Sequence, residues 1–156
     1  MQTTSTEIEQ TLILLAKTPH RIATASKDFE NSRLHSKPDT KSWSANDVLA
    51  HLRSCADVWG KTIQAMVAED TPTLPHVSPR TWIRKTNYTE LPFHISFQAF
   101  VTQRNELLIL LKNLGFEAWS RDAMIKGRKH TVFSQARRMV HHEHQHCDQM
   151  ELLLKK

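Results

Sequence analysis

The sequence predicts an all-α protein, a four-helix bundle, and three observations carry that prediction. Four long segments repeat their apolar residues every three or four positions, which is the spacing of one buried helix face. Only the short stretch 130–133 alternates in the manner of a strand. The chain has 156 residues, of which 39% are hydrophobic and 24% charged. This length and balance suit a single domain over residues 1–156.

Each predicted helix carries signals at its ends. Pro19 follows the first segment, so that helix either kinks there or restarts with the proline in a new first turn. Ser44 precedes the second segment, and Asp47 lies three positions after Ser44, which is the pattern of a capping box. Gly115 stops the third pattern at the usual position of a helix cap. The four helices are expected at 7–17, 45–67, 93–114 and 133–154.

The segment 69–92 connects the second and third helices. It contains four of the six prolines, which excludes a regular element throughout, although 81–85 can form a short helical turn. A connection this long is unusual in a bundle. It predicts a long crossover between helices two and three.

Charge and cysteine content exclude several classes of protein. The formal net charge is +5, but the cations are scattered, with no run of five like charges, so we expect a solvated surface and not a nucleic-acid partner. Neither an 18-residue apolar run nor a basic leader occurs, which argues against a membrane partner. The two cysteines, Cys55 and Cys147, read as reduced thiols of a cytoplasmic protein.

Four of the ten histidines lie within residues 141–146. On a helix, His142 and His146 are four positions apart and differ by about 40° in direction, so both rings can meet one cation, whereas His141 and His144 point elsewhere. A catalytic metal usually has three protein ligands. His51, the histidine inside the second helix, is the best third candidate. The alternative is that His142 and His146 are surface or capping residues.

The string from His142 to His146 also fits H-E-x-x-H, the zinc-protease motif, in which Glu143 would be the general base. Its context argues against a protease, because the helix is nearly the last element and no second lobe is evident for a peptide cleft.

Several motifs together resemble a known family. In chain order they are the Thr18-Pro19 step, the Trp43-Ser44 helix start, His51, and the terminal His142-Glu143-x-x-His146-x-x-Gln149. Their order and spacing resemble the DinB-like superfamily over nearly the whole chain.

The resemblance implies an up-up-down-down bundle, usually dimeric, with a divalent metal ion held by His51, His142 and His146. Zinc and nickel are the expected ions, since imidazole suits both. Some members of the superfamily are transferases whose metal activates a low-molecular-weight thiol such as bacillithiol or mycothiol. We therefore expect a metal-dependent thiol transferase or hydrolase acting on a small molecule. The alternative is a non-catalytic metal-binding bundle that acts through dimerisation.

Other residues leave their roles open. Arg104 lies within the apolar stripe of the third helix, where it either pairs with Glu143 in the interior or extends to the bundle end. Glu143, the expected catalytic residue, is otherwise a hydrogen-bond acceptor near the metal or merely exposed. Cys55 and Cys147 are ligands, redox groups or, by the simpler interpretation, core residues.

Two further expectations concern packing. Trp59 and Trp82 are expected to pack in the core and under the crossover. Apolar residues beyond one helix face, Val58, Leu153 and Leu154, predict a homodimer interface.

Overall fold

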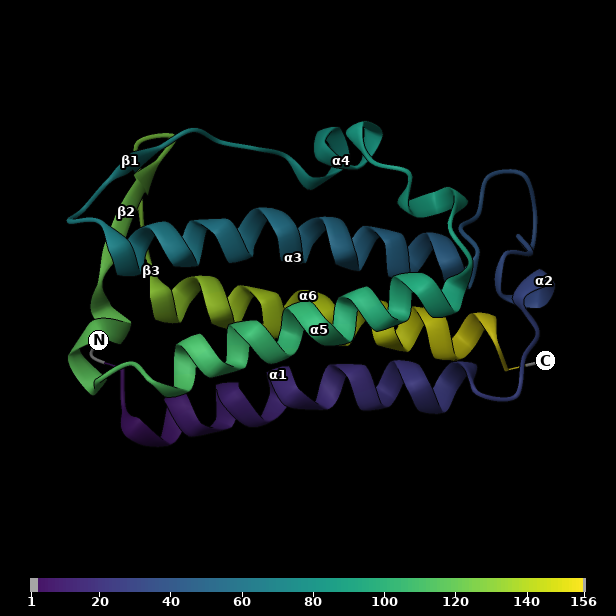
Figure 1. The fold of residues 1–156 in the computed structure, drawn as a ribbon, viewed down its shortest axis with the longest axis horizontal. Helices are drawn as coiled ribbons and strands as arrows, with labels where there is room; N and C mark the ends of the chain where they lie inside the picture. The colour runs from purple at the N-terminus through teal and green to yellow at the C-terminus, as the bar shows by residue number, and fades with distance from the viewer. Residues whose placement is uncertain (1–2, 156) are drawn as a thin grey trace.

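The structure, a computed structural model, describes residues 3–155 and is built around four long helices (Figure 1). They are α1 (Ser5–Ser26), α3 (Ala45–Ala68), α5 (Phe93–Lys112) and α6 (Val132–Leu153). All four predicted helices are therefore confirmed. The first runs on through Pro19 as one helix of 22 residues.

Short elements occupy the connections. The helical ones are α2 (Asn31–Leu34), α4 (Pro79–Trp82), η1 (Ile83–Lys85), η2 (Tyr88–Glu90) and η3 (Phe116–Ser120). The turn expected near 81–85 in the crossover is therefore present as α4 and η1.

Capping boxes define the starts of the two helices that carry the histidines. The Ser44 hydroxyl accepts from the Asp47 N–H at 3.0 Å, and the Asp47 carboxylate accepts from the Ser44 N–H at 3.0 Å. Thr131 and Ser134 form the corresponding pair at the start of α6. Because these bonds satisfy amides that helix geometry leaves unpaired, they hold each helix at a definite first residue.

The order of helix directions differs from the expected up-up-down-down. Arg53 donates to Ser96 and Gln103 donates to Asp57, so residue numbers rise together along α3 and α5 and the two helices are parallel. Figure 1 shows α1 and α6 running the opposite way to them. The order is up-down-down-up.

The physical reason lies in the connections. A crossover that runs the length of the bundle joins two parallel helices, whereas connections that stay at one end join antiparallel ones. One long crossover between α3 and α5 therefore implies up-down-down-up. The up-up-down-down order requires two long crossovers.

A small sheet, which the all-α prediction omitted, lies at one end of the bundle. Strands β2 (Asp122–Ile125) and β3 (Arg128–Thr131) form a hairpin, and β1 (Thr73–Leu74) pairs parallel to β2. Lys126 and Gly127 form the turn with φ of 51° and 72°, as a two-residue hairpin requires. The sheet attaches the start of the crossover to the connection before α6. Strands this short carry too few alternating residues to stand out in a sequence.

The bundle interior absorbs the apolar residues expected at a dimer interface. Leu154 is 5% exposed within the core, while Val58 and Leu153 are partly buried against it. These residues therefore do not form a free apolar face, and the dimer stays a prediction. No helix within residues 3–155 has the length and apolar character needed to cross a membrane.

Candidate metal centre

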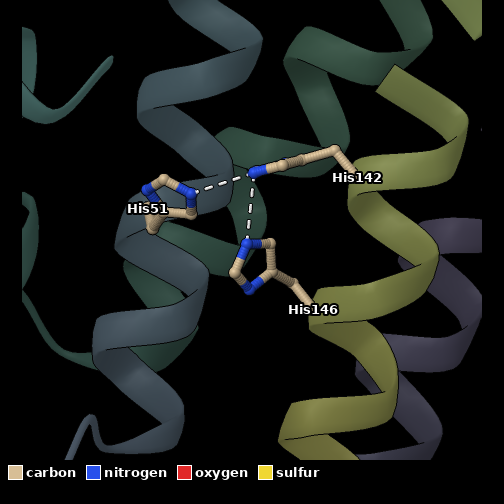
Figure 2. A group of neighbouring side chains, drawn as sticks. All are labelled: His51, His142 and His146. Atoms are coloured by element: carbon tan, nitrogen blue, oxygen red, sulfur yellow. Dashed lines mark hydrogen bonds between the residues drawn. The ribbon is translucent and has the colours of Figure 1, made fainter. Parts of the chain in front are cut away.

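The three histidines predicted as metal ligands meet between α3 and α6 (Figure 2). The Nε2 atom of His142 lies 3.1 Å from Nε2 of His51 and 3.1 Å from Nε2 of His146. The candidate ligand atoms all lie within 4.8 Å of one another. His51 is buried, whereas His142 and His146 are partly exposed, so the cluster lies at the edge of the bundle.

The helices explain this convergence. His142 and His146 occupy successive turns of α6, and their rings extend toward α3, as Figure 2 shows. His51 lies in the second turn of α3, at a height set by the Ser44 capping box. Since α3 and α6 run antiparallel, the early part of α3 faces the later part of α6.

The nitrogen atoms of the cluster fit a cation. His146 Nδ1 lies 2.8 Å from the Gln149 amide oxygen. That oxygen accepts a hydrogen bond from Nδ1–H, and a neutral ring then carries its lone pair on Nε2. His142 Nδ1 is buried without a hydrogen-bond partner among the described residues. Tetrahedral Zn–N bonds of about 2.0–2.1 Å place ligand nitrogens about 3.3 Å apart, close to the observed spacing. Three imidazoles are a donor set that suits zinc or nickel.

The environment keeps two of the rings neutral. Burial, followed by the charges of His146 and Arg80, lowers the pKa of His51 to about 4. Burial, with neighbouring histidines and Arg138, lowers the pKa of His142 to about 4. Neutral imidazole is the form that binds a metal ion.

Two tryptophans enclose the cluster. The Trp43 ring stacks on His146 with centroids 6.1 Å apart and also lies 5.1 Å from His51. The Trp59 ring meets His142 edge-on at 5.0 Å. Trp59 is a core residue as expected, but its contact with His142 and the role of Trp43 were not predicted. The signal available for Trp43 was its position one residue before the helix cap and two turns before His51.

Both cysteines are core residues. Cys55 nevertheless lies beside the cluster, with Sγ 3.6 Å from His51 Nε2. Burial, together with the charge of Glu143, raises its pKa to about 12. Its thiol therefore stays protonated while no metal ion is bound.

Comparison with known proteins assigns the family. The family model of the DinB superfamily matches residues 14–150. The chain belongs to the DinB superfamily. Among solved structures it is similar to YfiT from Bacillus subtilis, with a TM-score of 0.85 and 16% identity over 97% of this chain and 88% of YfiT. YfiT is described as a probable metal-dependent hydrolase with an unusual four-helix bundle topology. No curated protein matches the sequence.

Glu143 of this DinB-superfamily chain is joined to α1 and α5. Its carboxylate accepts from Arg104 with both oxygens, and Oε1 also accepts from the Thr18 hydroxyl at 2.8 Å. The buried Arg104–Glu143 pair, one of two alternatives from the sequence, is therefore confirmed. The carboxylate of Glu143 is therefore hydrogen-bonded by Arg104 and Thr18 and not by the histidine cluster. A catalytic role for Glu143 stays a prediction.

Pro19 accounts for the second bond of Arg104. In a regular helix the amide of residue 19 would donate to the carbonyl of Leu15, but proline has no N–H. Arg104 donates to that carbonyl at 2.7 Å. The guanidinium of Arg104 thus donates hydrogen bonds both to the free carbonyl of α1 and to the carboxylate on α6. The bond to the Leu15 carbonyl was not predicted from the sequence.

His141 and His144 lie outside the cluster, as predicted. Both are exposed, and His144 contacts Arg21 and Asp148 on the surface.

Proposed function

We propose that this DinB-superfamily chain is an enzyme that uses a divalent ion, zinc or nickel, held by His51, His142 and His146. One observation carries the proposal: three imidazole nitrogens from two helices converge, with no fourth histidine, cysteine or carboxylate in that cluster among residues 3–155. Three protein ligands with an open position are typical of catalytic zinc, whereas structural zinc has four.

The residues around the ion have distinct tasks. Burial keeps His51 and His142 neutral and ready to bind. Gln149 orients the His146 ring through Nδ1. Trp43 and Trp59 pack against the rings of His146 and His142. When bound, such an ion supplies Lewis acidity and lowers the pKa of a coordinated water or thiol toward neutrality.

We infer hydrolysis, or transfer of a low-molecular-weight thiol, on a small molecule. The description of YfiT supports hydrolysis, and the family resemblance supports thiol transfer. An open hollow of about 490 Å³ adjoins His142 and is lined also by Phe133, Arg138 and Gln145. Its size suits a small substrate better than a folded protein.

A second candidate function is a structural metal site. The observation that favours it is Cys55, whose sulfur lies 3.6 Å from His51 Nε2 and needs only a modest movement to become a fourth ligand. A His₃Cys shell would leave no position for a substrate.

Cobalt substitution distinguishes the two. The untagged protein is loaded with cobalt(II), its visible spectrum is recorded, and small thiols are added; Cys55→Ala is the matched variant. For the enzyme, we expect one ion per chain in both proteins and a spectral shift when a thiol binds. A sulfur-to-cobalt band that Cys55→Ala abolishes, with no response to any thiol, would instead establish the structural site.

A further inference from the structure

A half-open cavity of about 440 Å³ lies under the crossover, beside the histidine cluster. It is lined by residues of α3, the crossover, the β2–β3 hairpin and α6. Figure 1 shows the crossover extending along α3 from β1 to α4. The Trp59 ring separates this cavity from the metal ligands, since it lines the cavity and also contacts His142.

The roof of the cavity is attached at both ends. At one end, β1 pairs with β2 through Thr73–Met124 and Leu74–Ile125. At the other end, Trp82 Nε1 donates to Asp57 of α3 at 3.0 Å. A roof held at two points keeps the cavity open without a ligand, and largely preformed sites are characteristic of small-molecule binding.

The walls combine apolar surface with an excess of positive charge. Four cations line the cavity: Lys61, Lys126, Arg128 and Arg138. The ion pairs formed within residues 3–155 involve other cations. The one lining carboxylate, Asp57, already accepts from Trp82, Tyr88 and Gln103.

The cations are positioned next to aromatic faces. Lys61 Nζ lies 5.2 Å from the centre of the Trp82 ring, and Arg138 Cζ lies 4.7 Å from that of Trp59. Apolar side chains also line the cavity, including Val58, Leu74 and Ile125. A ligand could therefore place its anionic group at the cations and its apolar body against the rings.

Gln135 adds a neutral polar group to the lining. The residue is 2% exposed and lines the cavity, so a ligand in the cavity can meet its amide, which both donates and accepts hydrogen bonds.

We propose that the cavity binds a small organic anion with an apolar or aromatic body, such as a carboxylate, sulfonate or phosphate ester. None of His51, His142 and His146 lines the cavity, so the inference does not require a bound metal ion, although Arg138 and Trp59 also lie beside His142.

Calorimetric titration with naphthalene-2-sulfonate tests the proposal. Naphthalene-2-methanol is the uncharged analogue, and inorganic phosphate is an anion that lacks the aromatic ring. Naphthalene-2-carboxylate extends the test to another anionic group. Each titration uses the full chain, metal-free and zinc-loaded. We expect both naphthalene anions to bind at least tenfold more tightly than the alcohol or phosphate, with similar affinity in the two metal states, and more weakly as salt is raised.

Matched double variants locate the site. Arg128→Gln with Arg138→Gln removes two lining cations, and Lys129→Gln with Arg137→Gln removes their chain neighbours, which do not line the cavity. We expect roughly tenfold weaker sulfonate binding for the first pair and an unchanged affinity for the second. Gln135→Leu should weaken binding several-fold. Equal affinity for sulfonate and alcohol, or equal losses in both double variants, would overturn the proposal; circular dichroism verifies that each variant is folded.

Discussion

Helix α6 carries two polar clusters on adjoining turns, and the chain completes them differently. The carboxylate of Glu143 is satisfied within the protein, because Arg104 donates to both of its oxygens and Thr18 donates to Oε1. The Nε2 atoms of His142 and His146 lie 3.1 Å apart and meet only another ring nitrogen, and His142 Nδ1 has no partner among the described residues. A buried polar group that the chain satisfies holds the fold, whereas one that it leaves incomplete indicates a ligand.

Removing Glu143 should give the largest effect. Glu143→Ala leaves the Arg104 charge buried without its partner, which costs about 3–5 kcal/mol of the free energy of unfolding. Urea denaturation of the metal-free protein measures this loss. Glu151→Ala on the same helix removes an exposed ion pair with Arg21 and should cost about 1 kcal/mol or less.

The variant Glu143→Gln tests whether Glu143 is a catalytic residue. If the carboxylate serves the fold, this variant is destabilised and its activity per folded molecule changes little. If instead the variant is stable but turns over substrate slowly with metal bound, Glu143 is the general base that the H-E-x-x-H spacing predicted.

Variants of the histidine cluster should lose metal and not stability. We expect zinc binding to weaken by more than about 100-fold in each of His51→Ala, His142→Ala and His146→Ala. Loss of a residue that only hydrogen-bonds to a metal ligand already lowers metal affinity about 10–100-fold. Competition with a chelator of known affinity measures the change. His141→Ala and His144→Ala are the controls, and an equal loss in all five variants would contradict the assignment.

Gln149→Ala should have an intermediate effect on the same measurement. The variant lacks the Gln149 amide oxygen, so His146 loses the contact that orients its ring. Zinc affinity should therefore fall about 10–100-fold. Gln145→Ala, an exposed neighbour, should bind zinc as the unaltered protein does. If the two glutamine variants behave alike, Gln149 has no orienting role.

Acid should destabilise the metal-free protein modestly through His51 and His142. Their pKa of about 4 in the folded state lies below the ordinary value of 6.5, so between these limits the unfolded chain binds more protons. The free energy of unfolding should therefore fall as the pH drops from about 6.5 to about 4. Denaturant midpoints across this range should depend less on pH in the double variant His51→Gln, His142→Gln. An identical pH dependence in both proteins would contradict the explanation.

The sequence was informative wherever a periodic or spacing rule applied. Apolar periodicity predicted the four helices, the Ser44–Asp47 box predicted the start of α3, and the four-residue spacing brought His142 and His146 together. Helix direction could not be predicted from an apolar stripe, which looks the same in either direction. It could have been inferred from the single crossover, because residues 69–92 must connect parallel helices.

Other features depended on contacts between distant residues. Strands β1 and β2 are two and four residues long, so their pairing has little signature in sequence. The proximity of Trp43 to His146 depends on how α3 and α6 pack. Arg104 was conspicuous as a charge within an apolar stripe, and its pairing with Glu143 was one of two alternatives. Choosing between them required knowing that these side chains meet in the bundle interior.

The proline of α1 also has a consequence for how the helices find their partners. Inside that helix, backbone carbonyls are normally engaged by amides one turn later; the substitution of a proline ring for an amide at position 19 leaves the Leu15 carbonyl available at one height. Arg104 donates to that carbonyl, so a shift of α5 by one turn along α1 would leave both the guanidinium and the carbonyl without this hydrogen bond. A residue usually regarded as a helix breaker therefore helps to fix the register between α1 and α5.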